Sequence, residues 1–502
     1  MSVRHLARPA GLAAALTAAA VSLAPAPFAQ QTVNVSTGAA ASKAKNVIFF
    51  VGDGMGVSTV TATRVFSVGV AGQLQVDKFP FTALSRTYSE DAITADSAPT
   101  MTAMITGQNT NAGVLGLDKT TENKDFNHDG DGAHLTTLIE LAQAAGKKVG
   151  VVSTARITHA TPAACYAHIN NRDDENAIAL QSLPTDPTYN TALGAGVDFL
   201  VGGGRRFYVP NTVVDEEGSK GSRTDGRDLR AEYQAAGYSY VWNEAGFGAL
   251  TAADLPVIGL LESDHMEWEY DRPLDAGGEP SLTEMTAKAI DLLSGDPDGY
   301  VLMVESGRID HAHHAGNAWR ALTDTEELDR AIEATLAAVN LDDTLIVVTA
   351  DHSHVFNIAG YPLRPQSELP YTVASAPADW ADAPFSGLLN VVYDVNTTTG
   401  VVSATGDKNG VPYTVLGYGN GPGYRGAPRV NPLLDTFPGL NGVVPAGPAD
   451  PAYLQEASVP LAAETHAGEE VAIYAIGRNS SALRGTVKNT FTFKLMRRAL
   501  GL

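Results

Sequence analysis

Short apolar runs alternate with amphipathic segments from Lys45 to about Asn357. Apolar runs of this length are typical of buried strands, and helical spacing between them is typical of a parallel sheet covered by helices. The predicted strands are Val47–Val51, Val149–Val152, Phe199–Val201, Tyr300–Val304 and Leu345–Thr349. The predicted helices between them include Leu135–Ala145 and Thr325–Val339. The pattern therefore predicts an α/β fold with a large, mostly parallel β-sheet flanked by helices on both faces.

The pattern changes after this core, which we place at residues 45–357. Across residues 358–461 helical periodicity disappears, Gly and Pro become dense, and Thr, Val and Tyr form only short runs. This composition predicts an insertion of short strands and loops. A strand at Val471–Ile476 and a helix at Phe491–Leu500 then predict a return to the core within residues 462–502.

The N-terminus has the pattern of an export signal. Arg4 and Arg8 precede an apolar stretch from Leu12 to Leu23, and small residues follow it. The stretch is too short to span a bilayer comfortably. We therefore predict a signal peptide at residues 1–29, a flexible Ala/Ser/Thr-rich leader at 30–44, and a periplasmic or secreted protein without a membrane anchor.

Charge and cysteine content limit the partners and the kinds of metal site that the protein can have. The formal net charge of −22 argues against nucleic acid or an anionic membrane as the main partner. Bound divalent cations would reconcile this acidity with an anionic substrate, because a metal is often the largest charge in its site. Cys165 is the single cysteine, so an intramolecular disulfide and a multi-thiolate zinc site are excluded. We predict that Cys165 is a small buried hydrophobe.

Acidic residues and histidines follow or flank the predicted strands at widely separated places. Ligands gather at the carboxyl ends of parallel strands, so distant segments can converge there. Oxygen and imidazole ligands beside a hydroxyl nucleophile indicate two-metal hydrolysis of phosphate esters. The candidates for this site are Asp53, Ser97, Thr161, Glu305, Asp310, His314, Asp351, His352 and His466.

Local spacing supports several of these candidates. Asp310 and His314 are four residues apart, which puts both on one face of a helix where they can share a cation. Asp351 and His352 are adjacent, so they can reach one metal only from a bent strand end. The glycines around Asp53 do not match the dinucleotide-binding pattern, and a carboxylate among them fits cation binding better.

Ser97 is the candidate nucleophile, and a serine hydroxyl needs activation. The chain has no GxSxG motif, which argues against an α/β-hydrolase triad. Metal coordination and the N-terminus of the following helix would both stabilise the alkoxide. The alternative is that Ser97 only caps that helix, with Pro99 in the first turn, and the two roles are compatible.

The acidic segment at 125–132 has the opening spacing of a calcium-binding EF-hand loop. Its twelfth position is Thr136 instead of Glu, so the full pattern fails. We predict a solvated acidic loop, with weak Ca²⁺ binding as the minority alternative.

Six segments of the chain resemble the alkaline phosphatases, in the same order and from about Lys45 to the C-terminus. They are TADSAPTMTAMITG, HATPAACYAHINNR, VESGRIDHAHH, TADHSH, YTVLGYGNGPGY and ETHAGEEVAIYA. The resemblance implies a homodimer with two Zn²⁺ and one Mg²⁺ per subunit and a phosphoserine intermediate. It also implies that the insertion at 358–461 is crown-like.

The resemblance also assigns ligands by motif. One zinc would be held by Asp310, His314 and His466, the other by Asp53, Asp351, His352 and the Ser97 oxygen, and Mg²⁺ by Asp53, Thr161 and Glu305. Arg172 resembles the arginine with which this family binds phosphate, and a guanidinium fork suits two phosphate oxygens. Asp96 would orient that arginine.

Two further features resemble the animal members of the family. His159 and His311 stand where the well-known enteric bacterial form has an acid and a lysine, and a neutral imidazole attracts Mg²⁺ less than a carboxylate does. Glu262 and Glu279 lie in a segment similar to the calcium region of the animal enzymes, which implies a possible additional Ca²⁺.

The sequence thus predicts an alkaline phosphatase that hydrolyses small phosphate monoesters, with inorganic phosphate as product and inhibitor. The nearest alternative is a related metallohydrolase acting on phosphodiesters or sulfates. Sulfatases need C/S-x-P-x-R, and the stretch from Ser97 ends in Met101, which argues against a sulfatase. A non-catalytic metal-binding surface protein is the alternative from another class, but it would not need Ser97 aligned with Arg172.

Overall fold

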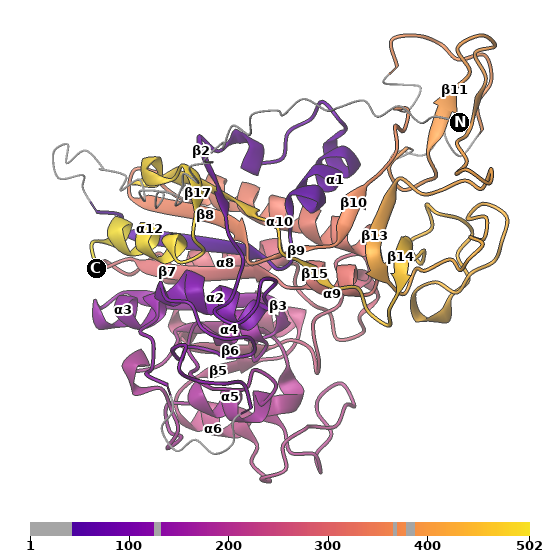
Figure 1. Cartoon of the computed structure of the whole chain (residues 1–502). Helices are drawn as coiled ribbons and strands as arrows, with labels where there is room; N and C mark the ends of the chain where they lie inside the picture. Colours follow the sequence, from indigo (N-terminus) through magenta and orange to yellow (C-terminus); the bar gives the residue numbers. More distant parts are fainter. Residues whose placement is uncertain (1–42, 125–131, 365–368, 378–386) are drawn as a thin grey trace, which may run out of the picture. The chain divides into compact units, whose positions relative to one another are not determined.

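A ten-stranded sheet forms the centre of the computed structural model, which describes residues 43–124, 132–364, 369–377 and 387–502 (Figure 1). In spatial order its strands are β17 (Gly485–Val487), β2 (Phe81–Ser85), β16 (Val471–Gly477), β8 (Thr344–Ala350), β1 (Asn46–Gly52), β7 (Tyr300–Ser306), β3 (Lys148–Arg156), β4 (Phe199–Gly203), β6 (Val257–Leu260) and β5 (Ser239–Val241). Every strand predicted for the core lies within one of these, so those predictions are confirmed.

The sheet is mostly parallel, as predicted. The central strands β8, β1, β7, β3 and β4 run parallel, and so do β6 and β5 beyond them. Only β16 runs antiparallel to its neighbours, β8 and β2. The C-terminal return therefore enters the sheet in the reverse direction, which apolar periodicity alone does not specify.

Alternation along the strands divides the core between two faces of the sheet. On β1, Val47, Phe49 and Val51 pack into one apolar cluster, and Ile48 and Phe50 pack into the other. Residues of α2, α3 and α12 complete the first cluster, and residues of α8 and α10 complete the second. Helices thus cover both faces, as predicted.

Several of the helices begin at residues whose side chains cap them. They are α1 (Val57–Val68), α2 (Ser97–Thr106), α3 (Leu138–Ala144), α4 (Ala160–Ala163), α5 (Glu175–Gln181), α6 (Leu229–Ala235), α7 (Glu244–Gly248), α8 (Leu282–Leu293), α9 (Arg308–His314), α10 (Ala318–Ala338) and α12 (Phe491–Leu500). Helix α3 starts later than predicted because Thr137 and Glu140 form a capping box. Helix α10 starts earlier than predicted, at the cap provided by Asn317.

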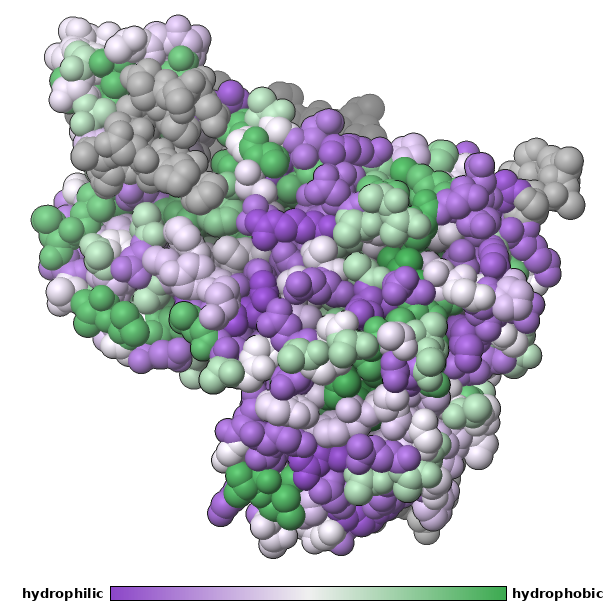
Figure 2. Space-filling view, turned by 180° about the vertical axis from the view of Figure 1, so that it is seen from behind, coloured by the Kyte–Doolittle hydropathy of each residue, from purple (hydrophilic) through white to green (hydrophobic). Residues whose placement is uncertain are grey.

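Short strands follow β8 in small separate sheets. They are β9 (Ser353–His354), β10 (Phe356–Ile358), β11 (Tyr393–Val395), β12 (Val402–Ala404), β13 (Leu416–Gly421), β14 (Glu456–Pro460) and β15 (His466–Ala467). Strand β15 pairs with β9, opposite His354 and Ser353, at the base of the 358–461 segment. Figure 2 shows a largely hydrophilic surface on which hydrophobic residues gather in several separate groups. In the part of the chain that is described, no helix is long and apolar enough to cross a membrane.

Some predictions fall outside the described residues. These are the signal peptide at 1–29, nearly all of the leader at 30–44, and most of the acidic segment at 125–132.

Candidate metal centre

The site candidates converge because β1 lies between two parallel neighbours. Gly52, the last residue of β1, is level with Ser306 on β7 and with Ala350 on β8. Asp53 follows β1 directly and Asp351 follows β8 directly, so both leave the sheet at the same edge. The strand ends thus bring distant parts of the sequence together, as the rule for parallel sheets predicts.

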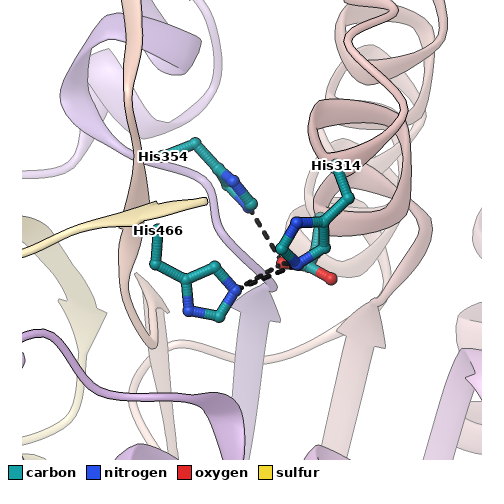
Figure 3. A group of neighbouring side chains, drawn as sticks. His314, His354 and His466 are labelled. Atoms are coloured by element: carbon teal, nitrogen blue, oxygen red, sulfur yellow. Dashed lines mark hydrogen bonds and ion pairs between the residues drawn. The ribbon is translucent and has the colours of Figure 1, made fainter. Parts of the chain in front are cut away.

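The first ligand group contains Asp310, His314 and His466 together with His354, their potential ligand atoms all lying within 4.8 Å of one another. His314 Nε2 and His466 Nε2 each lie 3.3 Å from Asp310 Oδ1. Asp310 and His314 share one face of α9, as their spacing predicts. Figure 3 shows the three histidines converging from this helix and from two strands.

Sequence reasoning missed His354. Its Nε2 lies 2.9 Å from Asp310 Oδ1, and its Nδ1 lies 2.5 Å from the carboxylate of Glu464. The available signal was the alternation in Asp351-His352-Ser353-His354, because residues two apart on a strand point to the same side. His354 links the Asp310 carboxylate to a second acid on the far side of the ring.

The second ligand group contains Asp53, Asp351 and His352, all fully buried. His352 Nε2 lies 3.3 Å from Asp53 Oδ1 and 3.3 Å from Asp351 Oδ2. Ser97 Oγ lies 3.2 Å from the same nitrogen and 3.5 Å from Asp53 Oδ1. The hydroxyl thus lies at the edge of a cluster of oxygen and nitrogen ligands.

Helix α2 presents that hydroxyl. Asp96 is the N-cap and accepts from Ala98 N at 3.0 Å, and Ser97 is the first helical residue. The alternative that Ser97 caps the helix is therefore wrong, because the Asp96 carboxylate takes that role. Pro99 lies in the first turn as expected. The Ser97 side chain remains available to the ligand cluster, where the helix N-terminus favours negative charge.

The third ligand group contains Asp53, His159 and Glu305. Thr161 Oγ1 lies 3.4 Å from Asp53 Oδ2, and Ser153 Oγ donates to Glu305. Asp53 belongs to both the second and the third group, the position that a bridging ligand needs. Among the described residues, Glu305 Oε1 and His159 Nδ1 have no hydrogen-bond partner although both are buried.

The carboxyl groups around Asp53 disfavour one another's charge. Burial, together with the charges of Asp351, Asp310 and Glu305, raises the pKa of Asp53 well above its ordinary value. Burial raises the pKa of Asp351 in the same direction and that of Glu305 to about 8. Asp310 differs, because hydrogen bonds and charge from its histidines outweigh burial and lower its pKa. Nearby positive charge is needed to keep the Asp53 group ionised.

Arg172 supplies one positive charge. Its Nη1 donates to Asp96 Oδ1 at 2.8 Å, and its Nη2 lies 2.9 Å from His159 Nε2. The predicted pairing with Asp96 is therefore present, and Arg172 is linked through Asp96 to the cap of α2. The guanidinium lies on the side of the Ser97 helix, between the cap and the third ligand group.

Three histidines pack together beside the third group. The His311 ring lies 4.0 Å from the His265 ring and 5.3 Å from the His159 ring, between centroids. Burial lowers the pKa of all three well below the ordinary histidine value. His265 was not a sequence candidate, because nothing in its flanking residues indicates that it meets His159.

A fourth group lies apart from these residues and contains Glu217, Glu262 and Asp275. The resemblance pairs Glu262 with Glu279. Burial, and then the charges of Glu262 and Asp275, raise the pKa of Glu279 to about 8. One carboxylate oxygen of Glu279 accepts from Glu267 N at 3.0 Å, and the other is buried without a hydrogen-bond partner in the described chain. Cation binding by this pair stays a prediction. Buried Cys165 agrees with its predicted role.

Comparison with known proteins agrees with this geometry. The alkaline phosphatase family model matches residues 44–502. The human tissue-nonspecific alkaline phosphatase isozyme is 35% identical over 90% of this chain and 83% of its own, and alkaline phosphatase from Gadus morhua is 35% identical over 90% of each.

Solved bacterial structures have the same fold. Alkaline phosphatase from the Antarctic bacterium TAB5 has a TM-score of 0.60 at 22% identity, covering 92% of this chain and 99% of its own. The Thermus thermophilus enzyme has a TM-score of 0.62 at 25% identity, covering 92% of both chains. The chain belongs to the alkaline phosphatase family and is a metal-dependent phosphomonoesterase.

Proposed function

We propose that this enzyme hydrolyses phosphate monoesters through a phosphoserine at Ser97, with two Zn²⁺ and one Mg²⁺ in the three adjoining ligand groups. Asp310, His314 and His466 would hold one zinc ion, with His354 orienting the shared carboxylate. Asp53, Asp351, His352 and the Ser97 oxygen would hold the other. Asp53, Thr161 and Glu305 would hold Mg²⁺, which prefers oxygen ligands.

The observation that carries the proposal is the position of Ser97 Oγ, 3.2 Å from His352 Nε2 beside buried carboxylates that lack enough positive charge. The residues fit metal ions. His159 Nδ1 and Glu305 Oε1 are buried without a hydrogen-bond partner in the described chain. Repulsion among Asp53, Asp351 and Glu305 would also be relieved by cations.

Bound divalent ions would supply Lewis-acid stabilisation of negative oxygen and lower the pKa of water to about 7. The side chains would position the nucleophile and the phosphate group. Ser97 Oγ would form a bond to phosphorus as the ester oxygen–phosphorus bond breaks, and the alcohol would depart. Water would then attack the same phosphorus, returning Ser97 and releasing phosphate. Throughout, Arg172 would hold phosphate oxygens from the side of Asp96.

His159 distinguishes the third group from an all-oxygen Mg²⁺ site. Imidazole suits zinc, whereas Mg²⁺ prefers oxygen ligands and retains water. In the TAB5 alkaline phosphatase, a form with one histidine changed to aspartate has Mg bound in the site called M3. By analogy, we propose that His159 weakens Mg²⁺ retention here and makes high turnover depend on added Mg²⁺.

A further cation site would lie at Glu217, Glu262 and Asp275. An all-carboxylate group suits Ca²⁺ better than zinc. Arg205, fully buried, forms ion pairs with Glu217 and Asp215 there, so the site already contains one compensating charge. Export, a homodimer and inhibition by phosphate are further proposals from the sequence.

The test compares p-nitrophenyl phosphate, its bis-ester and p-nitrophenyl sulfate, each with and without chelator. We expect chelator-sensitive hydrolysis of the monoester to dominate, and ³²P from substrate to remain on Ser97 after quenching at low pH. Preferred cleavage of the bis-ester or the sulfate would favour the related metallohydrolases. No hydrolysis by the metal-loaded protein would favour a binding protein.

A further inference from the structure

A buried histidine, His168, lies four residues before Arg172 in the chain and pairs with Glu140. His168 is 7% exposed and Glu140 4%. His168 Nε2 lies 2.8 Å from Glu140 Oε1, and His168 Nδ1 lies 2.7 Å from the carbonyl oxygen of Gly116. The exposed His134 ring stacks on His168 with the centroids 4.4 Å apart.

Both ring nitrogens of His168 face acceptor atoms. Gly116 O can only accept, so Nδ1 must carry a hydrogen. Glu140 also accepts from Asn190 Nδ2 at 2.6 Å and Thr137 N at 2.8 Å. Burial raises the pKa of Glu140, but the hydrogen bonds from His168 and Asn190 outweigh it and bring the pKa below its ordinary value. Acceptor oxygens thus face both ring nitrogens, and the imidazole is held on two sides.

The His168 ring links two short segments that both lead to Arg172. Leu115 and Ile169 exchange two backbone hydrogen bonds of 2.9 Å. Closer to the site, Arg172 N donates to Gly113 O at 2.9 Å. Gly113 N donates in turn to Asp96 Oδ2 at 2.9 Å, while Arg172 Nη1 reaches Asp96 Oδ1. An isolated antiparallel bridge and one further backbone hydrogen bond therefore join residues 113–116 to residues 168–172, with His168 at one end and Arg172 at the other.

The end at His168 is fixed on several sides. Gln181 accepts from His168 N at 2.8 Å and donates to His168 O at 3.1 Å. Glu140 is the N3 residue of the capping box of α3, so its carboxylate is held by the helix as well. Gly116 has a φ of 62°, and a Cβ there would lie 2.5 Å from His168 Nδ1. Glycine at this position is what lets the imidazole reach the carbonyl.

We propose that His168 and Glu140 are positioning residues for the phosphate clamp formed by Arg172 and Asp96. The inference rests on the proposed role of Arg172. A guanidinium fork discriminates by geometry, and displacement by about 1 Å is enough to weaken its contacts strongly. The hydrogen-bonded pair anchors the two joined segments to α3, so that Arg172 meets the cap of the Ser97 helix in one orientation.

The first test is His168→Gln in the metal-loaded enzyme. Its amide can reach one of the two acceptors and carries no charge. We expect KM and the inhibition constant for inorganic phosphate to rise about three- to tenfold, a fraction of the change expected for loss of the clamp itself, with a smaller change in kcat. Ser182→Ala is the matched control, because it loses a buried hydrogen bond to Tyr233 at 2.6 Å and should leave phosphate affinity unchanged.

A double-mutant cycle distinguishes positioning from general destabilisation. If His168 acts through Arg172, adding His168→Gln to Arg172→Ala should cause little further loss of phosphate affinity. A fully additive loss would overturn the proposal, as would unchanged phosphate affinity in the folded single variant. If Arg172→Ala itself keeps its phosphate affinity, the proposed clamp fails instead, whatever His168 does.

Glu140→Gln tests the same link with an isosteric change and serves if His168→Gln does not fold. We expect the same direction of change in phosphate affinity. An unchanged phosphate affinity in folded Glu140→Gln would overturn the proposal.

Discussion

The His168–Glu140 pair and the candidate metal centre are both buried groups of histidines and carboxylates, but their charges are balanced differently. Around His168 every charged atom faces a partner from the chain, and the pKa of Glu140 is lowered. Around Asp53 the carboxylates face one another, and the pKa values of Asp53, Asp351 and Glu305 are raised. The first group is complete within the protein, whereas the second needs cations from outside.

Metal removal tests this contrast with the largest expected effect. Chelation followed by dialysis should abolish hydrolysis of p-nitrophenyl phosphate, because the Asp53 group loses the charge that balances it. It should also lower the melting temperature, since a ligand that binds only the folded state stabilises it. Activity and calorimetry before and after adding back Zn²⁺ and Mg²⁺ measure both effects. Full activity in demonstrably metal-free protein would contradict the comparison.

Ser97→Ala should reduce turnover by orders of magnitude while both zinc ions stay bound. Three protein ligands remain in each proposed zinc set after the hydroxyl is lost, so the charge balance of the centre is preserved. Metal analysis and kcat check the two halves of this expectation. Near-normal turnover, with no labelled serine in the parent enzyme, would exclude covalent catalysis by Ser97.

Arg172→Ala should weaken phosphate binding while keeping substantial activity, because metal ions would supply most of the positive charge. Charge-assisted contacts contribute roughly 1.5–3 kcal/mol, which corresponds to a rise of about ten- to a hundredfold in the inhibition constant for phosphate. Inhibition kinetics with inorganic phosphate measure this constant. An unchanged constant would mean that Arg172 only stabilises the Asp96 cap.

Glu140→Gln should lower the free energy of unfolding by about 2 kcal/mol at neutral pH, because it weakens the buried hydrogen bonds that the carboxylate accepts. The pKa of Glu140 is lowered on folding, so its contribution is present above the unfolded value of about 4.3 and is lost as pH falls through the folded value. The wild type and the variant should therefore converge in acid. Urea unfolding at several pH values, with Ser182→Ala as control, measures this convergence. A difference in free energy of unfolding between wild type and variant that stays constant with pH would show that the carboxylate charge is irrelevant.

His159→Asp has the smallest expected effect. An added carboxylate should tighten Mg²⁺ retention by about tenfold and reduce inhibition by excess Zn²⁺, while slower phosphate release can lower turnover. Metal analysis after dialysis and activity across a Mg²⁺ titration check it. If the parent enzyme already retains Mg²⁺ through extensive dialysis and the variant is no different, His159 does not control the third group.

The sequence predicts those features that depend on neighbouring residues in the chain or on a general rule for parallel strands. The β1 strand lies where the apolar run at Val47–Val51 predicts it, and convergence of Asp53 with Asp351 follows from parallel strands ending together. The rest depends on contacts between distant residues. The reversal of β16 is such a case, and so is the approach of Glu217 to Glu262.

His354, which sequence reasoning missed, and the wrong alternative that Ser97 is the cap show the same limit. To predict His354 as a site residue, one must know that its strand brings the side chain to Asp310. Ser97 and Asp96 are both good N-caps by type, and only the backbone conformation shows that the Asp96 side chain does the capping.

The short ladder between β9 and β15 has a consequence for how the protein folds. It joins His354 to His466, which are separated in the chain by the whole of the 358–461 segment. Closing so long a loop costs entropy before any contact at its base repays it, and such non-local contacts slow folding. The histidine side of the centre should therefore assemble late, because the ligand group around Asp310 is incomplete in a nascent chain until His466 has been made.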